Sequence, residues 1–272
     1  MPVILITGAT DGLGRALAVG LGGEGATLIL HGRDADRLEQ VAAEVTGAGG
    51  AVPQTVVAAL ADLGQVRRLA AAVRDGTDRL DVLVSNAGIG SGRGGSGESR
   101  ERQTSADGHE LRFAVNYLAG FLLTHELLEL LQGSAPARIV NVASLAQQPL
   151  DFDDLMLEHD YQGGRAYAQS KLAQIMSGFE LAGRLAVEQV TVNSLHPSTF
   201  MPTKIVLQER GGSIDSLQQG VDATRRLAVD PELARTTGRF FDRFRDAEAD
   251  PQAYDAAARA ELWQRSEQLV GI

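Results

Sequence analysis

Residues 3–14 read Val-Ile-Leu-Ile-Thr-Gly-Ala-Thr-Asp-Gly-Leu-Gly, a short apolar run that leads directly into a turn with three glycines. A run of this length is typical of a strand that is buried on both faces. Gly8, Gly12 and Gly14 allow the backbone to turn tightly and to approach a phosphate at the N-terminus of the next helix, where unpaired N–H groups favour an anion. Their G-x-x-x-G-x-G spacing, with Leu13 inside it, differs from the more common G-x-G-x-x-G. The stretch predicts a strand–turn–helix unit that binds a phosphate.

Similar apolar runs recur along the chain and alternate with helical patterns. This alternation is typical of buried parallel strands that are joined by crossover helices. The sequence therefore predicts an α/β fold: a single doubly wound parallel sheet with helices on both faces and ligands at the carboxyl ends of the strands. We expect strands at 3–7, 26–30, 52–57, 82–86, 137–143, 190–195 and 238–242, and helices at 14–22, 36–46, 63–76, 108–131, 166–186 and 255–270.

The bulk composition limits the class of protein. Of the 272 residues, 44% are hydrophobic and 22% are charged, which is ordinary for a soluble globular domain. The absence of cysteine excludes disulfides and thiolate metal sites, and the net charge of −10 argues against a nucleic-acid surface. The chain has no run of 18 apolar residues and opens directly on a strand pattern. We therefore expect no membrane span, no targeting segment and a cytoplasmic location.

A tyrosine–lysine pair is conspicuous because lysine is rare in this chain. Of the 25 lysines and arginines, only Lys171 and Lys204 are lysines. Tyr167 precedes Lys171 by four residues, so both side chains are expected on one face of a helix. An ammonium is compact enough to lie beside a phenol and still reach a sugar hydroxyl, and it favours the phenolate form of the tyrosine. The pair therefore points to proton transfer.

Five motifs follow one another along the chain: the glycine turn at 7–14, Asn86-Ala87-Gly88, Asn116, Ser144, and the Tyr167/Lys171 pair. In this combination the chain resembles the short-chain dehydrogenases/reductases over its whole length. Residues 138–146 and His196-Pro197 are similar to the retinol-dehydrogenase-like and bacterial carbonyl-reductase-like members. The resemblance implies one Rossmann-like domain that spans residues 1–272, binds a nicotinamide cofactor, and transfers hydride between that cofactor and a carbonyl or an alcohol.

The resemblance also implies roles for individual residues. Tyr167 is expected to act as the general acid in reduction and as the general base in oxidation, with Lys171 beside it. Ser144 is expected to hydrogen-bond the substrate oxygen, and Asn116 to hold a water in a proton relay between Lys171 and solvent. No metal is expected. The residues expected to contact the cofactor are Gly8, Gly12, Leu13, Gly14, Arg33, Asp62, Asn86, Ala87, Gly88, Tyr167 and Lys171.

The end of the second predicted strand distinguishes NAD from NADP. An acidic residue about 20 positions after the glycines binds the ribose 2′-hydroxyl of NAD. Gly32 stands at that place, followed by Arg33. A guanidinium can grip a 2′-phosphate bidentately and stack on adenine, so NADP is expected, with NAD as the alternative. Arg15 is a second candidate for the phosphate. Asp62 is expected either to contact the adenine or only to cap the helix that follows it.

Substrate contacts are expected beyond the sixth predicted strand. The segment 199–219 carries several apolar residues, including Ile205, and is expected to form a lid over a lipophilic ketone or aldehyde. A buried helix would show similar residues. His196 is a candidate substrate contact. Ser198 stands where the family has glycine, and the usual threonine is displaced to Thr203, so the contribution of these two residues to nicotinamide binding stays open.

Two other functions remain open. A regulator that senses NADP without turnover would share the cofactor residues, but it has no use for the proton-transfer residues. An epimerase or dehydratase on the same fold would need contacts to a nucleotide sugar, which the chain does not display clearly. Ser144 and Tyr167 are separated by more residues than is usual in the family. The longer segment could obstruct a helix–helix dimer face, which leaves a homo-oligomer as an open question.

Overall fold

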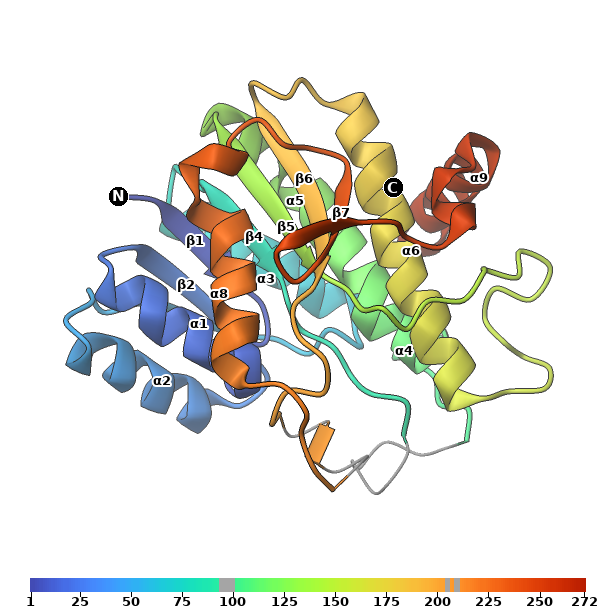
Figure 1. The fold of residues 1–272 in the computed structure, drawn as a ribbon, viewed down its shortest axis with the longest axis horizontal. Coiled ribbons are helices and arrows are strands. Elements are labelled where there is room, and N and C mark those ends of the chain that lie inside the picture. Colours follow the sequence, from blue (N-terminus) through green and yellow to red (C-terminus); the bar gives the residue numbers. More distant parts are fainter. Residues whose placement is uncertain (93–100, 204–205, 208–210) are drawn as a thin grey trace.

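An eight-stranded sheet runs through the centre of the molecule (Figure 1). The computed structural model describes residues 1–92, 101–203, 206–207 and 211–272. The strands lie in the order β3-β2-β1-β4-β5-β6-β7-β8, and all neighbours are parallel except β7 and β8. They span Val3–Ile6 (β1), Thr27–Gly32 (β2), Gln54–Val57 (β3), Val82–Ser85 (β4), Ala137–Val142 (β5), Val190–His196 (β6), Arg239–Asp242 (β7) and Arg245–Ala247 (β8). The direction of winding reverses between β1 and β4, the kind of place where α/β sheets bind ligands.

Strand β1 shows why the sheet is covered on both faces. Ile4 and Ile6 are fully buried in one apolar cluster, whereas Leu5 between them is buried in another. Successive side chains of a strand point to opposite faces, so a continuous apolar run needs a helical layer on each side. The prediction of a doubly wound α/β sheet is confirmed.

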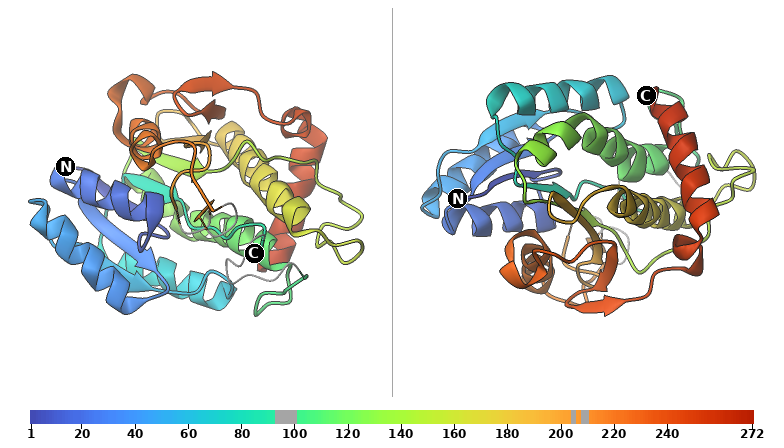
Figure 2. Two further views of the ribbon diagram at one scale, coloured as in Figure 1. Left: turned by 60° about the horizontal axis from the view of Figure 1, so that its bottom comes forward. Right: turned by 90° about the horizontal axis from the view of Figure 1, so that it is seen from above.

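The helices form two layers, one on each face of the sheet (Figure 2). On one face lie α1 (Gly12–Gly23), α2 (Ala35–Gly47) and α8 (Leu217–Val229). On the other lie α3 (Leu63–Gly76), α5 (Ala119–Gly133) and α6 (Gly163–Arg184), and the C-terminal α9 (Ala256–Val270) packs beside α6. Short helical segments in the described part of the chain include α4 (Leu111–Phe113), η1 (Ala114–Leu118), η2 (Pro231–Leu233) and η3 (Pro251–Tyr254).

Aspartate side chains begin the first three helices. Asp11, Asp34 and Asp62 each accept a hydrogen bond from a backbone N–H in the first turn of α1, α2 and α3, respectively. Such caps satisfy N–H groups that have no partner within the helix. Because these helices follow β1, β2 and β3, the caps fix three strand–helix turns along the same edge of the sheet.

The helix predicted at 108–131 begins later than expected. Gly108 has a φ of +83°, and Glu110 forms an isolated β-bridge with Thr104, so the first helical residue is Leu111. The chain then passes through the π-helical turn η1 before it continues as α5. Asn116 lies in this turn, and π-helical turns are frequent at functional sites.

The sequence patterns miss helix α8 and strand β8, as well as the short helices η2 and η3. Helix α8 buries Val221, Thr224 and Ala228 against the sheet, a spacing typical of an amphipathic helix. Its first turn, residues 217–219, belongs to the segment predicted as a lid. Within the same segment, residues 204–205 and 208–210 lie outside the described part of the chain, so the prediction for Ile205 does as well.

Candidate active site

A cavity of about 430 Å³ opens at the carboxyl ends of the central strands. Its walls come from the turns after β1, β2, β4, β5 and β6 and from the N-terminal half of α6. The volume lies in the range of small-molecule and cofactor sites. Most of the predicted site residues line this cavity: Gly8, Gly12, Leu13, Gly14, Arg33, Asn86, Ala87, Gly88, Ser144, Tyr167 and Lys171. Asp62 and Asn116 do not.

The glycine turn before α1 has no room for side chains. Gly8 has a φ of +68° and Gly12 a φ of +51°, a region that other residues rarely adopt. A Cβ atom on Gly14 would lie 2.3 Å from the carbonyl oxygen of Gly8. The backbone at the start of α1 can therefore line the cavity directly, and its N–H groups and helix dipole favour a bound phosphate.

Thr7 joins the glycine turn to the end of β4. Its Oγ1 accepts hydrogen bonds from the N–H groups of Asn86 at 2.9 Å and Ala87 at 3.0 Å. In return, Nδ2 of Asn86 donates to the carbonyl oxygen of Thr7 at 2.8 Å. These reciprocal bonds hold two neighbouring turns of the cavity wall together. Thr7 was absent from the predicted site residues, although it opens the glycine motif.

His31 braces the glycine turn from the other side. The imidazole is buried, and its Nδ1 accepts a hydrogen bond from the N–H of Gly8 at 3.3 Å. Its Nε2 lies 3.0 Å from the carbonyl oxygen of Ala58, so the proton of the neutral ring belongs on Nε2. Burial lowers the pKa of His31 to about 4. The ring is therefore neutral at neutral pH. It links β2 to Gly8, which follows β1, and to Ala58, which follows β3.

Two guanidinium groups line the part of the cavity that β2 and α2 form. Arg33 follows β2, as predicted, and Arg37 joins it from the first turn of α2. Arg37 is not among the residues predicted from the sequence, although its position four residues after Arg33 is a visible signal. Arg15 does not line the cavity: its guanidinium forms an ion pair with Glu44 on α2. The structure therefore does not bring Arg15 into the phosphate site.

Asp62 caps α3 beside the cavity. Its carboxylate accepts hydrogen bonds from the backbone N–H of Gln65 at 3.1 Å and from the side-chain amide of Gln65 at 3.0 Å. These bonds lower the pKa of Asp62, with the side-chain bond as the largest cause. The adenine contact expected for Asp62 stays a prediction.

Asn116 anchors the loop that follows β4. Its Oδ1 accepts a hydrogen bond from the N–H of Ile89 at 2.7 Å, and its Nδ2 donates to the carbonyl oxygen of Ile89 at 3.1 Å and to Oγ of Ser170 at 3.0 Å. Both amide hydrogens are therefore used within the protein. The relay water expected at Asn116 stays a prediction, and the structure adds a role that holds Gly88 and Ile89 against α6.

Tyr167 and Lys171 lie one turn apart on α6, and both line the cavity. Nζ of Lys171 donates to the carbonyl oxygen of Val142 at 2.8 Å and to Oε1 of Gln174 at 3.4 Å. An ammonium has three hydrogens, so one remains for a ligand as far as the described residues are concerned. Burial lowers the pKa of Lys171 to about 8, which keeps the group charged at neutral pH.

Ser144 follows β5 and is buried at the wall of the cavity. Its Oγ accepts a hydrogen bond from the N–H of Ala146 at 3.0 Å. No residue in the described ranges accepts the hydrogen of this hydroxyl. Ser144 can therefore donate to an oxygen atom of a ligand.

Apolar side chains line the cavity from two directions. One group surrounds the loop after β4 and the start of α4, and the other belongs to the segment after β6: Ile89, Leu111 and Val115 in the first, Phe200, Met201 and Val206 in the second. His196 and Ser198 also line the cavity and are buried. Burial lowers the pKa of His196 to about 4, so this ring is also neutral at neutral pH.

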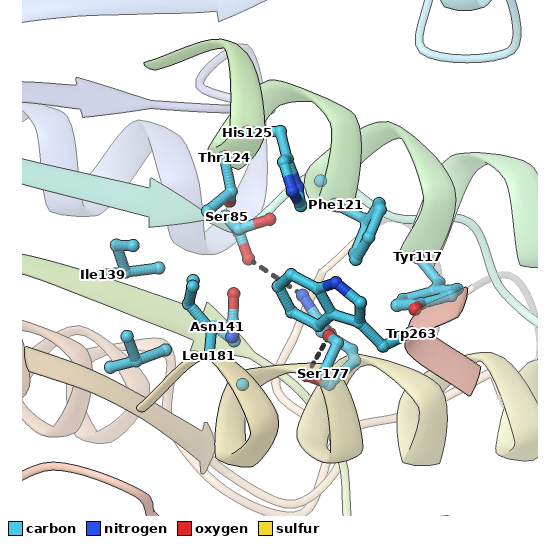
Figure 3. Close-up of a pocket in the computed structure, with 14 residues that line it drawn as sticks. Ser85, Tyr117, Phe121, Thr124, His125, Ile139, Asn141, Ser177, Leu181 and Trp263 are labelled. Carbon is cyan, nitrogen blue, oxygen red and sulfur yellow. Dashed lines mark hydrogen bonds between the residues drawn. The ribbon is translucent and has the colours of Figure 1, made fainter. Parts of the chain in front are cut away.

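A second pocket of about 20 Å³ is lined by residues of the sheet and of α5, α6 and α9 (Figure 3). Trp263 of α9 forms one wall and makes an edge contact with Phe121, with 4.9 Å between the ring centroids. Gln174 connects this pocket to Lys171, and its Nε2 donates to the carbonyl oxygen of Ser85 at 3.4 Å. The volume suits a single water molecule and excludes a substrate.

The main cavity fits a nicotinamide dinucleotide. In the sheet, β1 and β4 separate β2 from β5, so Arg33 and Ser144 lie toward opposite ends of the cavity. The glycine turn after β1 lies between them, at the place where a pyrophosphate would bind. The guanidinium groups of Arg33 and Arg37 lie on the β2 side. The hydroxyl groups of Ser144 and Tyr167 and the ammonium of Lys171 lie on the β5 side. This order matches a dinucleotide with its adenosine half at β2 and its reactive ring near Ser144 and Tyr167.

Comparisons with known proteins agree with this arrangement. The short chain dehydrogenase family matches residues 2–211. Human retinol dehydrogenase 13 is 35% identical over 295 residues, which cover 99% of this chain and 84% of the relative. A protein of Streptomyces sp. (strain C5), provisionally named a daunorubicin C-13 ketoreductase, is 37% identical over 278 residues, which cover 98% and 92% of the two chains. The solved RhlG/NADP active-site complex from Pseudomonas aeruginosa has a TM-score of 0.71 at 26% identity, with 89% and 94% of the two chains covered.

The chain therefore belongs to the short-chain dehydrogenase family, as its motifs predicted. It is an NAD(P)-dependent oxidoreductase that acts on a small molecule. Across the part of the chain that the structure describes, none of the helices has the length and apolar character needed to cross a membrane.

Proposed function

We propose that this protein reduces lipophilic ketones or aldehydes with NADPH. The observation that carries the proposal is the distribution of groups in one cavity. Ser144, Tyr167 and Lys171 stand on the β5 side, and Arg33 and Arg37 stand on the β2 side. The first set suits proton transfer to a carbonyl oxygen, and the second suits a phosphorylated ribose.

Three side chains carry the reduction at the substrate oxygen. A bound NADPH would supply the hydride. Ser144 donates its hydroxyl hydrogen to the carbonyl oxygen and orients the substrate. Tyr167 delivers a proton to the same oxygen, a general-acid contribution of about 10²- to 10⁴-fold. Lys171, held by the carbonyl of Val142, places a positive charge near the phenol and stabilises the phenolate that forms.

The preference for NADP rests on the end of β2. Gly32 stands where the acidic residue that binds the NAD ribose is expected, and a Cβ atom there would lie 2.4 Å from Cγ2 of Thr10, so a side chain at this position would require Thr10 to move. The first carboxylate after Gly32 in the sequence, that of Asp34, caps α2 and lies 3.4 Å from the guanidinium of Arg37. Arg33 and Arg37 supply the charge for a 2′-phosphate, and RhlG is a similar protein that was solved with NADP. NAD remains the alternative.

The substrate class rests on the apolar lining of the cavity. The apolar side chains after β4 and β6 line the same cavity as Ser144 and Tyr167, and they can bury a lipophilic body around one carbonyl group. Two relatives carry names that refer to retinol and to a ketone of daunorubicin. The proposal includes a lid formed by residues 199–219 and one domain over residues 1–272. The cytoplasmic location stays a prediction, and the oligomeric state stays an open question.

A panel of carbonyl compounds tests the proposal. Purified protein is incubated with NADPH, or in parallel with NADH, and with 4-nitrobenzaldehyde, all-trans-retinal or daunorubicin, and the alcohol product is measured by chromatography. We expect product from at least one carbonyl, with kcat/KM at least tenfold higher for NADPH than for NADH, about 1.4 kcal/mol. A preference for NADH overturns the choice of cofactor. Binding of NADPH without product from any carbonyl overturns the reductase proposal and favours a sensor of NADP.

A further inference from the structure

Residues 198–200, which follow β6, lie against residues 214–215. The carboxylate of Asp215 joins these two stretches. Oδ2 of Asp215 accepts hydrogen bonds from the N–H of Thr199 at 2.8 Å and from Oγ of Ser198 at 3.2 Å. Two backbone bonds extend this contact: the N–H of Asp215 donates to the carbonyl oxygen of Thr199 at 3.1 Å, and that of Ile214 donates to Phe200 at 3.0 Å. Residues 198–200 and residues 214–215 are therefore fixed to each other beside the cavity.

Arg243, in the turn between β7 and β8, joins the same carboxylate from outside the segment. Its Nη2 donates to Oδ2 of Asp215 at 2.9 Å and to Oγ1 of Thr199 at 2.8 Å. Its backbone N–H donates to the carbonyl oxygen of His196 at 2.8 Å. The side chains of Asp215 and Arg243 are only 20% and 29% exposed, so solvent screens their attraction in part. We call Ser198, Thr199, Asp215 and Arg243 the clamp.

The clamp reaches the cavity through Thr199 and Ser198. Oγ1 of Thr199 accepts a hydrogen bond from Arg243 and lies 3.0 Å from Nε2 of His196, to which it can donate its own hydrogen. That arrangement requires a neutral His196 with its proton on Nδ1, in agreement with the lowered pKa of this buried ring. His196 and Ser198 are both buried in the cavity wall. The ion pair thus fixes side chains that a ligand would touch.

The clamp also accounts for the serine that departs from the family pattern. The family pattern has glycine after Pro197, and the sequence alone did not show what Ser198 does in its place. The hydroxyl of Ser198 donates to Asp215, so the serine adds one more bond between the cavity wall and the clamp. Ser198 and Asp215 are 17 residues apart in the sequence, yet they act as one unit.

We propose that Asp215 and Arg243 are positioning residues that hold residues 198–200 in place as a wall of the substrate site and thereby set the affinity for the carbonyl substrate. Neither of these two residues lines the cavity, so each acts through Ser198 and Thr199. The substrate part of this inference rests on the proposed function. Among the described residues, no hydrogen bond or ion pair of the clamp involves Arg33 or the glycine turn, so NADPH affinity is expected to stay nearly constant when the clamp is broken.

Two variants break the clamp and one serves as a matched control. Arg243→Gln and Asp215→Asn each remove one charge of the pair. Arg245→Gln removes an exposed arginine of β8 two residues away. The first measurement is hydrogen–deuterium exchange at the amides of Thr199, Ile214 and Asp215 in the presence of NADPH. We expect exchange at least tenfold faster in both clamp variants and unchanged in the control.

The second measurement is steady-state reduction of 4-nitrobenzaldehyde at saturating NADPH. We expect KM to rise at least fivefold in both clamp variants, while kcat and the Kd for NADPH stay within twofold of the wild type. Arg243→Lys keeps the positive charge but loses the planar guanidinium with its several N–H donors. Its KM for the carbonyl is therefore expected to lie between those of the wild type and Arg243→Gln. If Arg243→Gln does not fold, Ser198→Gly removes a single bond of the clamp and replaces it in both measurements, with smaller changes in the same direction.

The outcomes separate the clamp from the proposed function. Unchanged exchange in both variants overturns the clamp. Faster exchange with an unchanged KM overturns the positioning role and leaves only a structural one. Wild-type protein that binds NADPH and reduces no carbonyl overturns the proposed function instead, and the exchange measurement then still decides whether the clamp holds the cavity wall.

Discussion

Nζ of Lys171 lies 6.0 Å from the centroid of the Tyr167 ring, and the same ammonium is buried and bonded to the carbonyl oxygen of Val142. A buried charge is costly unless it is paired, and no carboxylate contacts this one within the described residues. The cofactor-free protein therefore keeps a charged group in its interior at the expense of stability. That cost is explained if the ammonium serves the phenol and a bound ligand.

Lys171→Met is expected to stabilise the cofactor-free protein by about 1–3 kcal/mol at pH 7. Burial lowers the pKa of Lys171 from 10.5 to about 8, and each unit corresponds to about 1.4 kcal/mol, less the bond to Val142 that is lost. Between pH 8 and 10.5 the unfolded chain binds more protons than the folded one, so wild-type stability rises with pH in this window. The advantage of the variant should therefore shrink. Urea unfolding at pH 7 and pH 9.5 measures both effects, and a variant that is less stable than the wild type at pH 7 contradicts the account.

Gly14→Ala is expected to lose about 1–3 kcal/mol of stability and at least tenfold in NADPH affinity. The added Cβ would lie 2.3 Å from the carbonyl oxygen of Gly8 and 2.6 Å from Nδ2 of Asn86, so the phosphate turn must shift. Gly20→Ala is the control, because Gly20 lies on the same helix with nothing within 4 Å of the added atom. This control should gain about 0.5–1 kcal/mol. Equal effects of the two substitutions on NADPH affinity would argue against a phosphate site at the turn.

Arg33→Ala is expected to weaken NADPH binding at least tenfold and to leave NADH binding unchanged. A hydrogen bond to a charged group is worth about 1.5–3 kcal/mol, and only NADPH offers the 2′-phosphate. Arg37→Ala should have a smaller effect in the same direction, because Arg37 also faces Asp34. Arg15→Ala serves as the control, since its guanidinium pairs with Glu44. Fluorescence titration of the four proteins with both cofactors measures this, and a loss in Arg15→Ala as large as that in Arg33→Ala would place the phosphate elsewhere.

The sequence predicted the sheet well because each central strand is an apolar run between turn residues. The parallel strands β1 to β6 were predicted to within two residues at each end, and the run at 238–242 matches β7 closely. The runs give no sign of the order of the strands across the sheet, which depends on how distant segments pack and is seen only in the structure. Helix α8 was missed because its first turn reads as the end of an apolar segment, and β8 has only three residues.

The candidate site was predictable where residue type and local spacing carry the chemistry. Tyr167 and Lys171 are neighbours by helix geometry alone, and Arg33 follows a strand that the pattern reveals. The clamp was not predictable, because Asp215 and Arg243 are 28 residues apart in the sequence and meet only when β7 pairs with β6. The anchoring bonds of Asn116 depend in the same way on a π-helical turn that no sequence pattern marks.

Turnover and cofactor binding of Tyr167→Phe, measured side by side, test the central claim most directly. The variant removes a single oxygen atom from the side chain that is proposed to deliver the proton. We predict that kcat/KM for the best carbonyl of the panel falls by about 10³-fold, within the range of general-acid contributions, while the Kd for NADPH changes less than threefold. Turnover that survives in Tyr167→Phe would contradict the account, because the proton would then come from another group.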